Sequence, residues 1–259
     1  MNDSDTKVLS KVAMFRSIRD MQGYRIYATD GEIGDLGDFL FDDEKWVLRH
    51  FVVDMNGREV LLSPIAFAGA NWDARIMNVN LTLEQIQNSP DIDTDLPISR
   101  KMETEYYDFY GWPYYWGGVY TSAGGIYPYQ AGVMGAVALE PEDKLPEQKE
   151  FTDDEIHLRS ADEVIGYHVE AMDGGIGKVV DFIINDADFG VQFVVIDTEP
   201  LWFGGKVLLP TDRINSVSWP GRIITLNAAR DEVKAAPNWD HAKPVCREYA
   251  DCIQQHYKK

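Results

Sequence analysis

The chain has 259 residues, 45% of them hydrophobic, which is enough apolar material for one large domain or two small ones. Its formal net charge of −19 repels phosphate backbones and anionic lipid surfaces, so we expect no nucleic-acid partner. Because no long apolar run occurs and both cysteines lie near the C-terminus, we expect a cytoplasmic protein without direct membrane insertion and without a disulfide framework.

The chain contains an internal duplication. Residues 16–55 align without gaps with residues 159–198, and residues 60–93 align with residues 207–240 after a four-residue insertion. Of the 74 aligned pairs, 23 are identical. Such self-similarity predicts two copies of one small domain.

The first copy predicts a succession of short strands. An Asp-Gly hairpin signal at Asp30 and Gly31 tolerates positive φ, and strands with alternating apolar positions or a high Val and Phe content follow it. After a first strand that begins near Gly23, strands are expected over 34–42, 46–54, 59–63 and 75–80, and a short helix over 82–90. The positions that backbone geometry restricts are Gly23, Asp30, Gly31, Gly34 and Asp38.

An aromatic segment lies between the copies. Residues 106–129 include eleven aromatic residues, and no sustained helix or strand period extends over 101–150. We therefore expect a linker that clamps the two domains, or two chains of a homodimer, together. The alternative is that its rings stack on a flat ligand such as a quinone or a pigment. The expected contact residues are Tyr106, Tyr107, Tyr110, Trp112, Tyr114, Tyr115 and Trp116, with Trp202 and Phe203 in the four-residue insertion.

The second copy repeats the pattern of the first. Its strands are expected over 177–185, 190–197, 206–210 and 222–227, and its short helix is stopped by Pro237. The restricted positions are Gly166, Asp173, Gly174, Gly177 and Asp181. Several short strands with tight turns in each copy predict a mainly β protein made of two small antiparallel barrels.

The C-terminal segment predicts a helix. Its apolar stripe, formed by Val245, Tyr249, Cys252 and His256, is expected to dock on a barrel. The alternative is a zinc site, because His241, Cys246, Cys252 and His256 are suitable ligands, but their spacing fits no familiar finger. We expect no metal there.

The repeated residues resemble the PRC-barrel family. The resemblance rests on the list Gly166, Asp173, Gly174, Ile176, Gly177 and Asp181, the "FVVID" and "KVLLP" strands, and the corresponding residues of the first copy. The family is represented by the cytoplasmic domain of the photosynthetic reaction centre H subunit, and the repeat is also similar to the C-terminal domain of a ribosome maturation factor. The resemblance implies a binding or scaffolding module. The similarity to the reaction centre H subunit implies a module that is linked to an electron-transfer complex.

The expected domain organisation follows from the duplication and the resemblance. It consists of an N-terminal tail (1–12), a first PRC-barrel repeat (13–98), an aromatic and acidic linker (99–155), a second repeat (156–241) and a C-terminal helix (242–259).

Three groups of polar residues are candidates for chemistry. Calcium could be held by the turns at Asp42 and Asp43 and at 185–188, although solvated hairpin turns explain them better. The repeated carboxylates Asp38 and Asp181, and those at the ends of the third strands, are interpreted as acceptors of backbone N–H bonds. The five histidines form no repeated pair and are interpreted as solvated strand or loop residues. Since no catalytic motif is present, we expect a non-enzymatic protein without a cofactor, whose protein partner is unknown.

Overall fold

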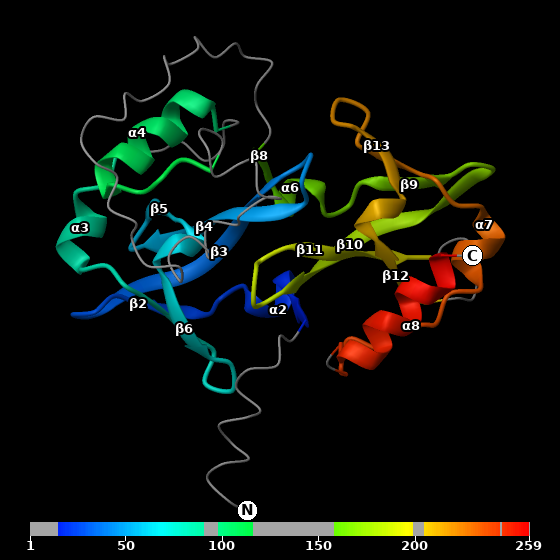
Figure 1. The fold of residues 1–259 in the computed structure, drawn as a ribbon, viewed down its shortest axis with the longest axis horizontal. Coiled ribbons are helices and arrows are strands. Elements are labelled where there is room, and N and C mark those ends of the chain that lie inside the picture. The colour runs from blue at the N-terminus through cyan, green and yellow to red at the C-terminus, as the bar shows by residue number, and fades with distance from the viewer. Residues whose placement is uncertain (1–14, 91–97, 116–157, 199–204, 244, 259) are drawn as a thin grey trace, which may run out of the picture. The chain divides into compact units, whose positions relative to one another are not determined.

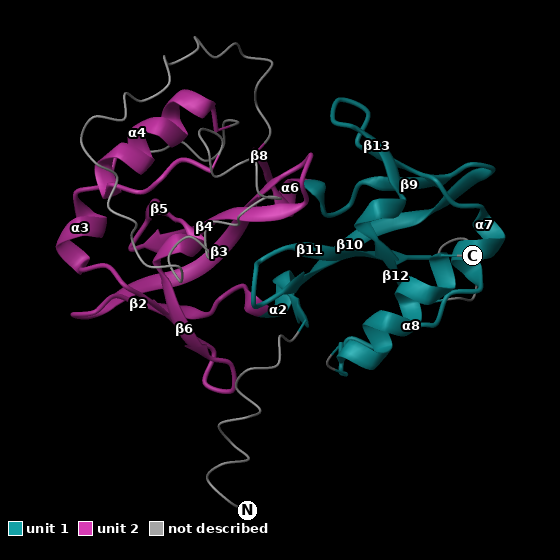
Figure 2. Ribbon diagram, in the orientation of Figure 1, with its two compact units in different colours: residues 1–20, 164–259 teal, residues 21–163 magenta. Residues whose placement is uncertain are grey.

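The computed structural model describes residues 15–90, 98–115, 158–198, 205–243 and 245–258 (Figure 1). The described chain is mainly β, as predicted. It divides into two units, each with one seven-stranded sheet among the described residues (Figure 2). Unit 1 comprises Met1–Asp20 and Val164–Lys259, and unit 2 comprises Met21–Glu163. No helix in the described ranges is long and apolar enough to span a membrane.

The sheet of unit 2 has the order β5-β4-β3-β2-β7-β6, and β8 pairs with β3. Its strands are β2 (Arg25–Tyr27), β3 (Glu32–Asp42), β4 (Val47–Met55), β5 (Arg58–Leu62), β6 (Phe67–Asn71), β7 (Ile76–Val79) and β8 (Leu158–Ser160). Its helical elements are η1 (Pro64–Ala66), α3 (Leu83–Gln87) and α4 (Arg100–Tyr110). The pairs are antiparallel, as expected, except β2 with β7, which are parallel.

Unit 1 has the same arrangement, with the order β12-β11-β10-β9-β14-β13 and with β1 paired to β10. Its strands are β1 (Phe15–Ser17), β9 (His168–Ala171), β10 (Gly174–Asn185), β11 (Val191–Asp197), β12 (Lys206–Pro210), β13 (Ile214–Ser218) and β14 (Ile223–Leu226). Its helices are η4 (Thr211–Arg213), α7 (Arg230–Lys234) and α8 (Arg247–Tyr257). In both units, the two strands that end the order do not pair with each other within the described residues, so closure into a barrel stays a prediction.

The two repeats exchange their first strands. β1 lies at the start of the first copy in sequence but pairs with β10 of the second, in the register Ser17 opposite Ile183. Conversely, β8 lies at the start of the second copy but pairs with β3 of the first, in the register Ser160 opposite Leu40. The chain passes from one unit to the other within two short helices, α2 (Ile18–Met21) and α6 (Ala161–Val164). Each sheet is therefore completed by the strand that begins the other repeat in sequence.

A glycine at the start of the long central strand allows a close backbone approach. In β10, Gly177 has φ of +151°, and a Cβ added to it would lie 1.9 Å from the carbonyl oxygen of Asp197 in β11. In β3, Gly34 has φ of +158°, and its added Cβ would lie 1.9 Å from the carbonyl oxygen of Asp54. Only glycine fits at these two equivalent positions.

The duplication extends further than the aligned sequences. α4 follows the first copy and α8 follows the second, and each has eleven residues, Arg100–Tyr110 and Arg247–Tyr257. The same numerical offset that relates the second halves of the two copies also relates these helices. A helix therefore stands where residues 101–150 were expected to show no helical period. Ser99 caps its start by accepting a bond from the backbone N–H of Met102 at 3.3 Å, and Gly111 ends it with φ of +66°.

α8 docks by an apolar stripe, as predicted, but the stripe is turned by about one residue. The buried residues of the helix are Ala250, Ile253 and Tyr257, and the helix packs against β12. Cys252 is exposed, and Tyr249 and His256 are only half-buried. Of the predicted stripe, Val245 is buried, but the other three residues show that the stripe was wrong in its phase along the helix.

Candidate functional site

α4 places two tyrosines of the aromatic segment into the core of unit 2. Tyr106 and Tyr107 are fully buried. The Tyr106 hydroxyl accepts a bond from the backbone N–H of Leu61 at 3.0 Å and donates to the Ser89 hydroxyl at 3.3 Å. Burial raises the pKa of both tyrosines. These two rings serve the packing of α4 on the sheet and are not available to a ligand.

A buried polar cluster lies beneath the same helix. We define it as Asp42, Arg49, His50, Arg100, Glu103 and Tyr115. Glu103 is at its centre, because its carboxylate accepts bonds from Arg100 at 2.7 Å and from the Tyr115 hydroxyl at 2.8 Å, and lies 3.2 Å from the His50 ring. The side chains of His50 and Glu103 are 0% and 2% exposed, so the interpretation of His50 as a solvated strand residue was wrong.

Tyr115 is enclosed by charged groups. The guanidinium of Arg49 lies over its ring, 3.7 Å from the centroid, and Arg100 donates to its hydroxyl at 2.7 Å. Arg49 in turn donates to Asp42 at 3.0 Å. Burial and the nearby Glu103 raise the pKa of Tyr115 well above its usual value. The ring therefore has an arginine on its face, where the ligand-platform hypothesis places a ligand.

Among the residues of unit 1 that the structure describes, this cluster has no counterpart. The residues equivalent to Arg49, His50 and Glu103 are Gln192, Phe193 and Ala250. Phe193 packs instead against Phe15 of the exchanged strand, with ring centroids 6.1 Å apart. At the positions of His50 and Glu103 the second copy thus has apolar side chains, whereas the position of Arg49 stays polar.

The chemistry open to the polar cluster is limited by its burial. Its carboxylates are bonded to arginine and tyrosine, and two atoms, His50 Nδ1 and Arg49 Nε, are buried without a partner among the described residues. Such atoms commonly bind an internal water molecule. The arrangement fastens α4 to β4. In the sequence it corresponds to a difference between the copies, because His50 and Glu103 stand where the second copy has an apolar residue.

The end of α4 carries a group of aromatic side chains, of which Phe109 is exposed and the others are partly buried. We call Phe109, Tyr110, Trp112 and Tyr114 the aromatic edge. Phe109 is 43% exposed, and Tyr110 and Trp112 stack with centroids 4.3 Å apart and an angle of 12° between the rings. The Tyr114 hydroxyl donates to Asp108, and burial, together with this bond, raises the pKa of Tyr114 to about 12. Trp116, Trp202 and Phe203, which were expected to join these contacts, lie outside the described residues.

The repeated carboxylates Asp38 and Asp181 bind the exchanged strands. Ser160 donates to Asp38 at 2.5 Å, and Ser17 donates to Asp181 at 2.5 Å. Each carboxylate also accepts a backbone N–H two residues beyond its serine, and each sits beside a β-bulge. Apart from the backbone N–H of Phe182, which Asp181 also accepts, the bonded residues belong to the exchanged segment and not to the carboxylate's own turn.

A second repeated acidic pair connects each hairpin turn to a short helix. Asp30 accepts a bond from the backbone N–H of Leu83 in α3 at 2.8 Å, and Asp173 accepts one from Arg230 in α7 at 2.8 Å. The first N–H groups of a helix have no partner within the helix, so a carboxylate there satisfies one of them. Sequence reasoning assigned these residues only to the turn.

The candidate calcium turns use their oxygens internally. Asp42 accepts bonds from two backbone N–H groups of its own turn and from Arg49, while Asp43 pairs with Arg159 at 3.2 Å. At the equivalent turn, Asp186 pairs with Arg16 at 3.0 Å. These ion pairs bind the exchanged strands a second time.

The candidate zinc ligands remain apart in the described C-terminal region. Cys246 and Cys252 are both exposed, and His256 lies 2.8 Å from the carbonyl oxygen of Glu232. Among the residues that the structure describes, no three His, Cys, Asp or Glu side chains are arranged to hold a metal ion.

Asp181 makes the stability of unit 1 dependent on pH. Burial raises its pKa to about 6, against the hydrogen bonds from Ser17 and from backbone N–H groups, which lower it. This folded-state pKa lies above that of the unfolded chain, so the folded chain binds the proton more tightly. The contribution of the protonated Asp181 to the free energy of unfolding is therefore fully present below about pH 4 and is lost as the pH rises through about 6. The same sign applies to Asp38, whose pKa burial also raises to about 6.

We therefore expect Asp181→Asn to flatten this dependence. Relative to the natural chain, the variant should gain about 2 kcal/mol in the free energy of unfolding between about pH 4.5 and 7. Urea titrations at several pH values measure the difference. Asp212→Asn, at an exposed position, is the control and should show no such trend. A pH-independent difference for Asp181→Asn would contradict the burial of its carboxylate.

The fold and the contacts define a class: a duplicated, mainly β protein whose two seven-stranded sheets are completed by exchanged strands and covered by equivalent closing helices. No protein-family model matches the chain, and a search of curated proteins finds no significant match.

Proposed function

We propose that the chain is a non-enzymatic protein-interaction or scaffold protein of the PRC-barrel type, and that the aromatic edge of unit 2 is its docking surface. The observation that carries the proposal is the exposure of Phe109 beside the stacked rings of Tyr110 and Trp112. Exposed aromatic side chains that are held rigidly by their neighbours are enriched at protein interfaces and contribute most of the binding free energy there.

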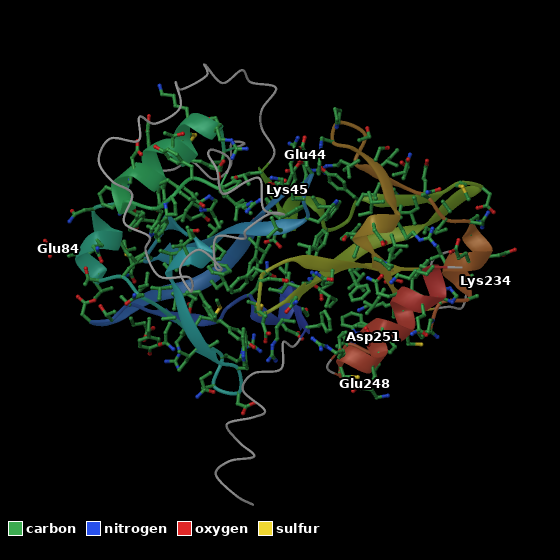
Figure 3. All side chains as sticks on the ribbon, viewed as in Figure 1. Glu44, Lys45, Glu84, Lys234, Glu248 and Asp251 are labelled. Carbon is green, nitrogen blue, oxygen red and sulfur yellow. The ribbon has the colours of Figure 1, made fainter. Side chains whose placement is uncertain are left out.

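The charge around the aromatic edge indicates the chemistry of the partner. Glu105 and Asp108 are exposed on the same helix, and acidic side chains such as Glu84 on α3 add to the negative surface of unit 2 (Figure 3). An arginine side chain can stack on an aromatic face and pair with a carboxylate at once. The partner that fits is a protein surface with arginine and apolar side chains.

The partner class rests on the sequence resemblance. Both repeats resemble the soluble domain of the photosynthetic reaction centre H subunit, so we propose a protein of an electron-transfer complex as the partner. A quinone or pigment bound by the aromatic segment is the second candidate. It is less well supported, because Arg49 covers the face of Tyr115 and Tyr107 packs against Trp112 and His50. Native mass spectrometry that finds an organic molecule on the purified chain would favour it.

Replacing Phe109 with alanine tests the docking surface. We expect Phe109→Ala to reduce the affinity for a partner by at least about tenfold, since exposed aromatic anchors contribute about 2 kcal/mol or more. The measurement is quantitative affinity capture from the native host with the full chain as bait, followed by titration of the recovered protein.

The matched control is Met172→Ala. Met172 is the other large apolar side chain that is exposed in the described residues, and it lies in unit 1. A partner that binds Phe109→Ala as tightly as the natural chain excludes the aromatic edge, and failure to recover any specific protein excludes the function itself.

A further inference from the structure

The two units differ sharply in net charge. Unit 2, residues 21–163, contains 27 acidic and 10 basic residues, so its formal net charge is −17. Unit 1 contains 16 acidic and 14 basic residues, and its formal net charge is only −2. Because the sheets of both units have the same order of strands, the fold itself does not require the acidic excess of unit 2. A charge of this size selects the partners that approach a surface.

Part of the acidic excess forms a row across three neighbouring strands of unit 2. Asp35 in β3 is paired with Asp54 in β4, and Asp54 is paired with Glu59 in β5. All three side chains are exposed, and we call them the acidic row. Arg25 in β2 is paired with Asp35, so the three acidic residues and this one basic residue together have a formal charge of −2.

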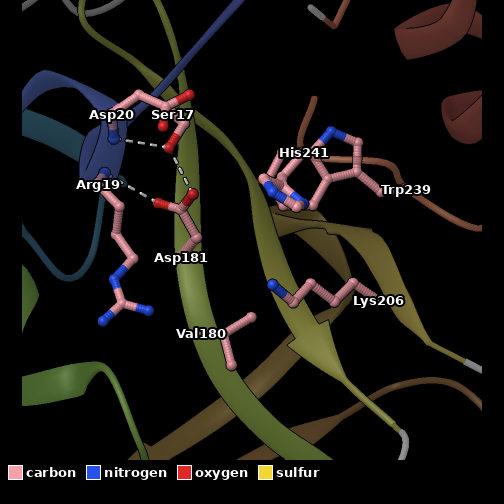
Figure 4. Close-up of a pocket in the computed structure, with 8 residues that line it drawn as sticks. All are labelled: Ser17, Arg19, Asp20, Val180, Asp181, Lys206, Trp239 and His241. Carbon is pink, nitrogen blue, oxygen red and sulfur yellow. Dashed lines mark hydrogen bonds between the residues drawn. The ribbon is translucent and has the colours of Figure 1, made fainter. Parts of the chain in front are cut away.

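The corresponding row of unit 1 has alternating charges. There Asp197 is paired with Lys178 on one side and with Lys206 on the other. The same balance holds in a small pocket of this unit, whose lining includes two carboxylates and the cations Arg19 and Lys206 (Figure 4). Like charges directly opposite each other on neighbouring strands are destabilising. The same sheet positions therefore carry favourable charge pairs in unit 1 and unfavourable ones in unit 2.

The acidic row adjoins the aromatic edge on one face of the sheet. Two rings of the aromatic edge pack against an apolar cluster that includes Val52 in β4 and Leu61 in β5, which are paired with each other. Asp54 and Glu59 form the pair two positions further along the same strands. Since alternate residues of a strand point to the same face and two residues span about 7 Å, the acidic pair lies beside the residues on which the rings pack.

The spacing of the acidic row suits an extended segment with several cations. Neighbouring strands lie about 4.8 Å apart, so one segment that crosses β3, β4 and β5 can reach all three carboxylates. The planar guanidinium group of arginine pairs with a carboxylate through two parallel bonds and also stacks on aromatic rings. Both kinds of contact are offered on this face.

We propose that the acidic row extends the docking surface of the aromatic edge, and that the surface binds a basic protein segment with both arginine and apolar side chains. This partner deepens the proposed function and rests on it. The apolar side chains pack on Phe109 and its neighbouring rings, while the guanidinium groups pair with the acidic row. Charges that are unfavourable in the free chain become favourable contacts in the complex.

A synthetic peptide of alternating arginine and leucine residues serves as the probe. It is titrated into the full chain by calorimetry at several sodium chloride concentrations. We expect saturable binding that weakens as the salt concentration rises, because salt screens ion pairs at a surface. A peptide with glutamate in place of arginine should not bind.

Charge reversal in the acidic row should weaken the binding of this peptide. Asp35→Lys gives unit 2 the charge that Lys178 has in unit 1, and we expect a loss of affinity of about fivefold or more. Glu44→Lys is the matched control, because it makes the same change of charge at an exposed position beyond the other end of β3 (Figure 3). It should bind nearly as tightly as the natural chain.

A double variant separates lost binding from lost folding. Asp35→Lys combined with Glu59→Lys reproduces the charges of unit 1 and should weaken binding by about tenfold or more. It exchanges two like-charge pairs with Asp54 for two opposite-charge pairs and loses one opposite-charge pair with Arg25. Its unfolding in urea should therefore occur at a concentration no lower than that of the natural chain.

Nuclear magnetic resonance locates the bound peptide. The indole N–H resonance of Trp112, assigned with Trp112→Phe, should shift when the peptide is added, whereas that of Trp219 in unit 1 should stay in place. An unmoved Trp112 resonance, equal affinities of Asp35→Lys and Glu44→Lys, binding that does not depend on salt, or no saturable binding would each overturn the proposal. Displacement of the peptide by calcium at constant ionic strength would assign the row to a metal ion and overturn it as well.

The proposed function fails on a different result. It fails if affinity capture recovers no specific protein. If Phe109→Ala weakens the binding of a captured protein and Asp35→Lys does not, the aromatic edge remains the docking surface and only the role of the acidic row is refuted.

Discussion

Gly177→Ala is expected to lower the free energy of unfolding of unit 1 by on the order of 4 kcal/mol. Its Cβ would meet the carbonyl oxygen of Asp197 at 1.9 Å, and both atoms belong to paired strands that cannot move apart without loss of the sheet. The backbone at φ of +151° is also one that other residues rarely adopt. Urea unfolding followed by circular dichroism measures the effect.

The control lies two residues away on the same strand. A Cβ at Gly175 would meet nothing within 4 Å, so Gly175→Ala should change the free energy of unfolding by less than about 0.5 kcal/mol. Gly34→Ala should reproduce the large loss in unit 2, where the Cβ would meet the carbonyl oxygen of Asp54 at 1.9 Å. If Gly177→Ala and Gly175→Ala unfold at the same urea concentration, the close approach of β10 to β11 is refuted.

The second large effect is expected from Glu103→Gln, which should lower the free energy of unfolding of unit 2 by about 3 kcal/mol. The substitution keeps the size of the side chain but removes the charge that balances Arg100 in a buried place. It also replaces one acceptor oxygen by an N–H group that faces the donors Arg100 and Tyr115. Chemical denaturation of the full chain gives the value.

Glu105→Gln is the matched control for this prediction. Glu105 lies on the same helix but is exposed, so its substitution should change the free energy by less than about 0.5 kcal/mol. Tyr115→Phe should give an intermediate loss of about 1–2 kcal/mol, because only the hydroxyl is removed. A Glu103→Gln variant as stable as Glu105→Gln would show that the polar cluster does not fasten α4.

The strands could be predicted from the sequence because their signals are local. The alternation of apolar residues and the turn residues Asp30 and Asp173 lie within a few positions of the strands that they define. The expected strand over 34–42 is found within β3, and that over 177–185 within β10.

α4 escaped prediction because tyrosine, phenylalanine and glycine dominate its neighbourhood. Aromatic residues have only intermediate helix propensity, so the helix depends on burying Tyr106 and Tyr107 against the sheet. The burial of His50 was hidden for the same kind of reason. Its partner Glu103 is 53 positions away, and no local pattern connects them.

The sequence by itself determined the duplication, the mainly β class, the positions of most strands and the glycines at which the backbone must bend. Only the tertiary structure decided which copy each first strand completes. Ser17 and Ser160 are equivalent, as are Asp38 and Asp181, so the same contact is available within a repeat and between repeats. Local residue identity cannot separate two pairings with the same contact. The choice depends on the path of the chain through α2 and α6, which carries each strand to the other sheet.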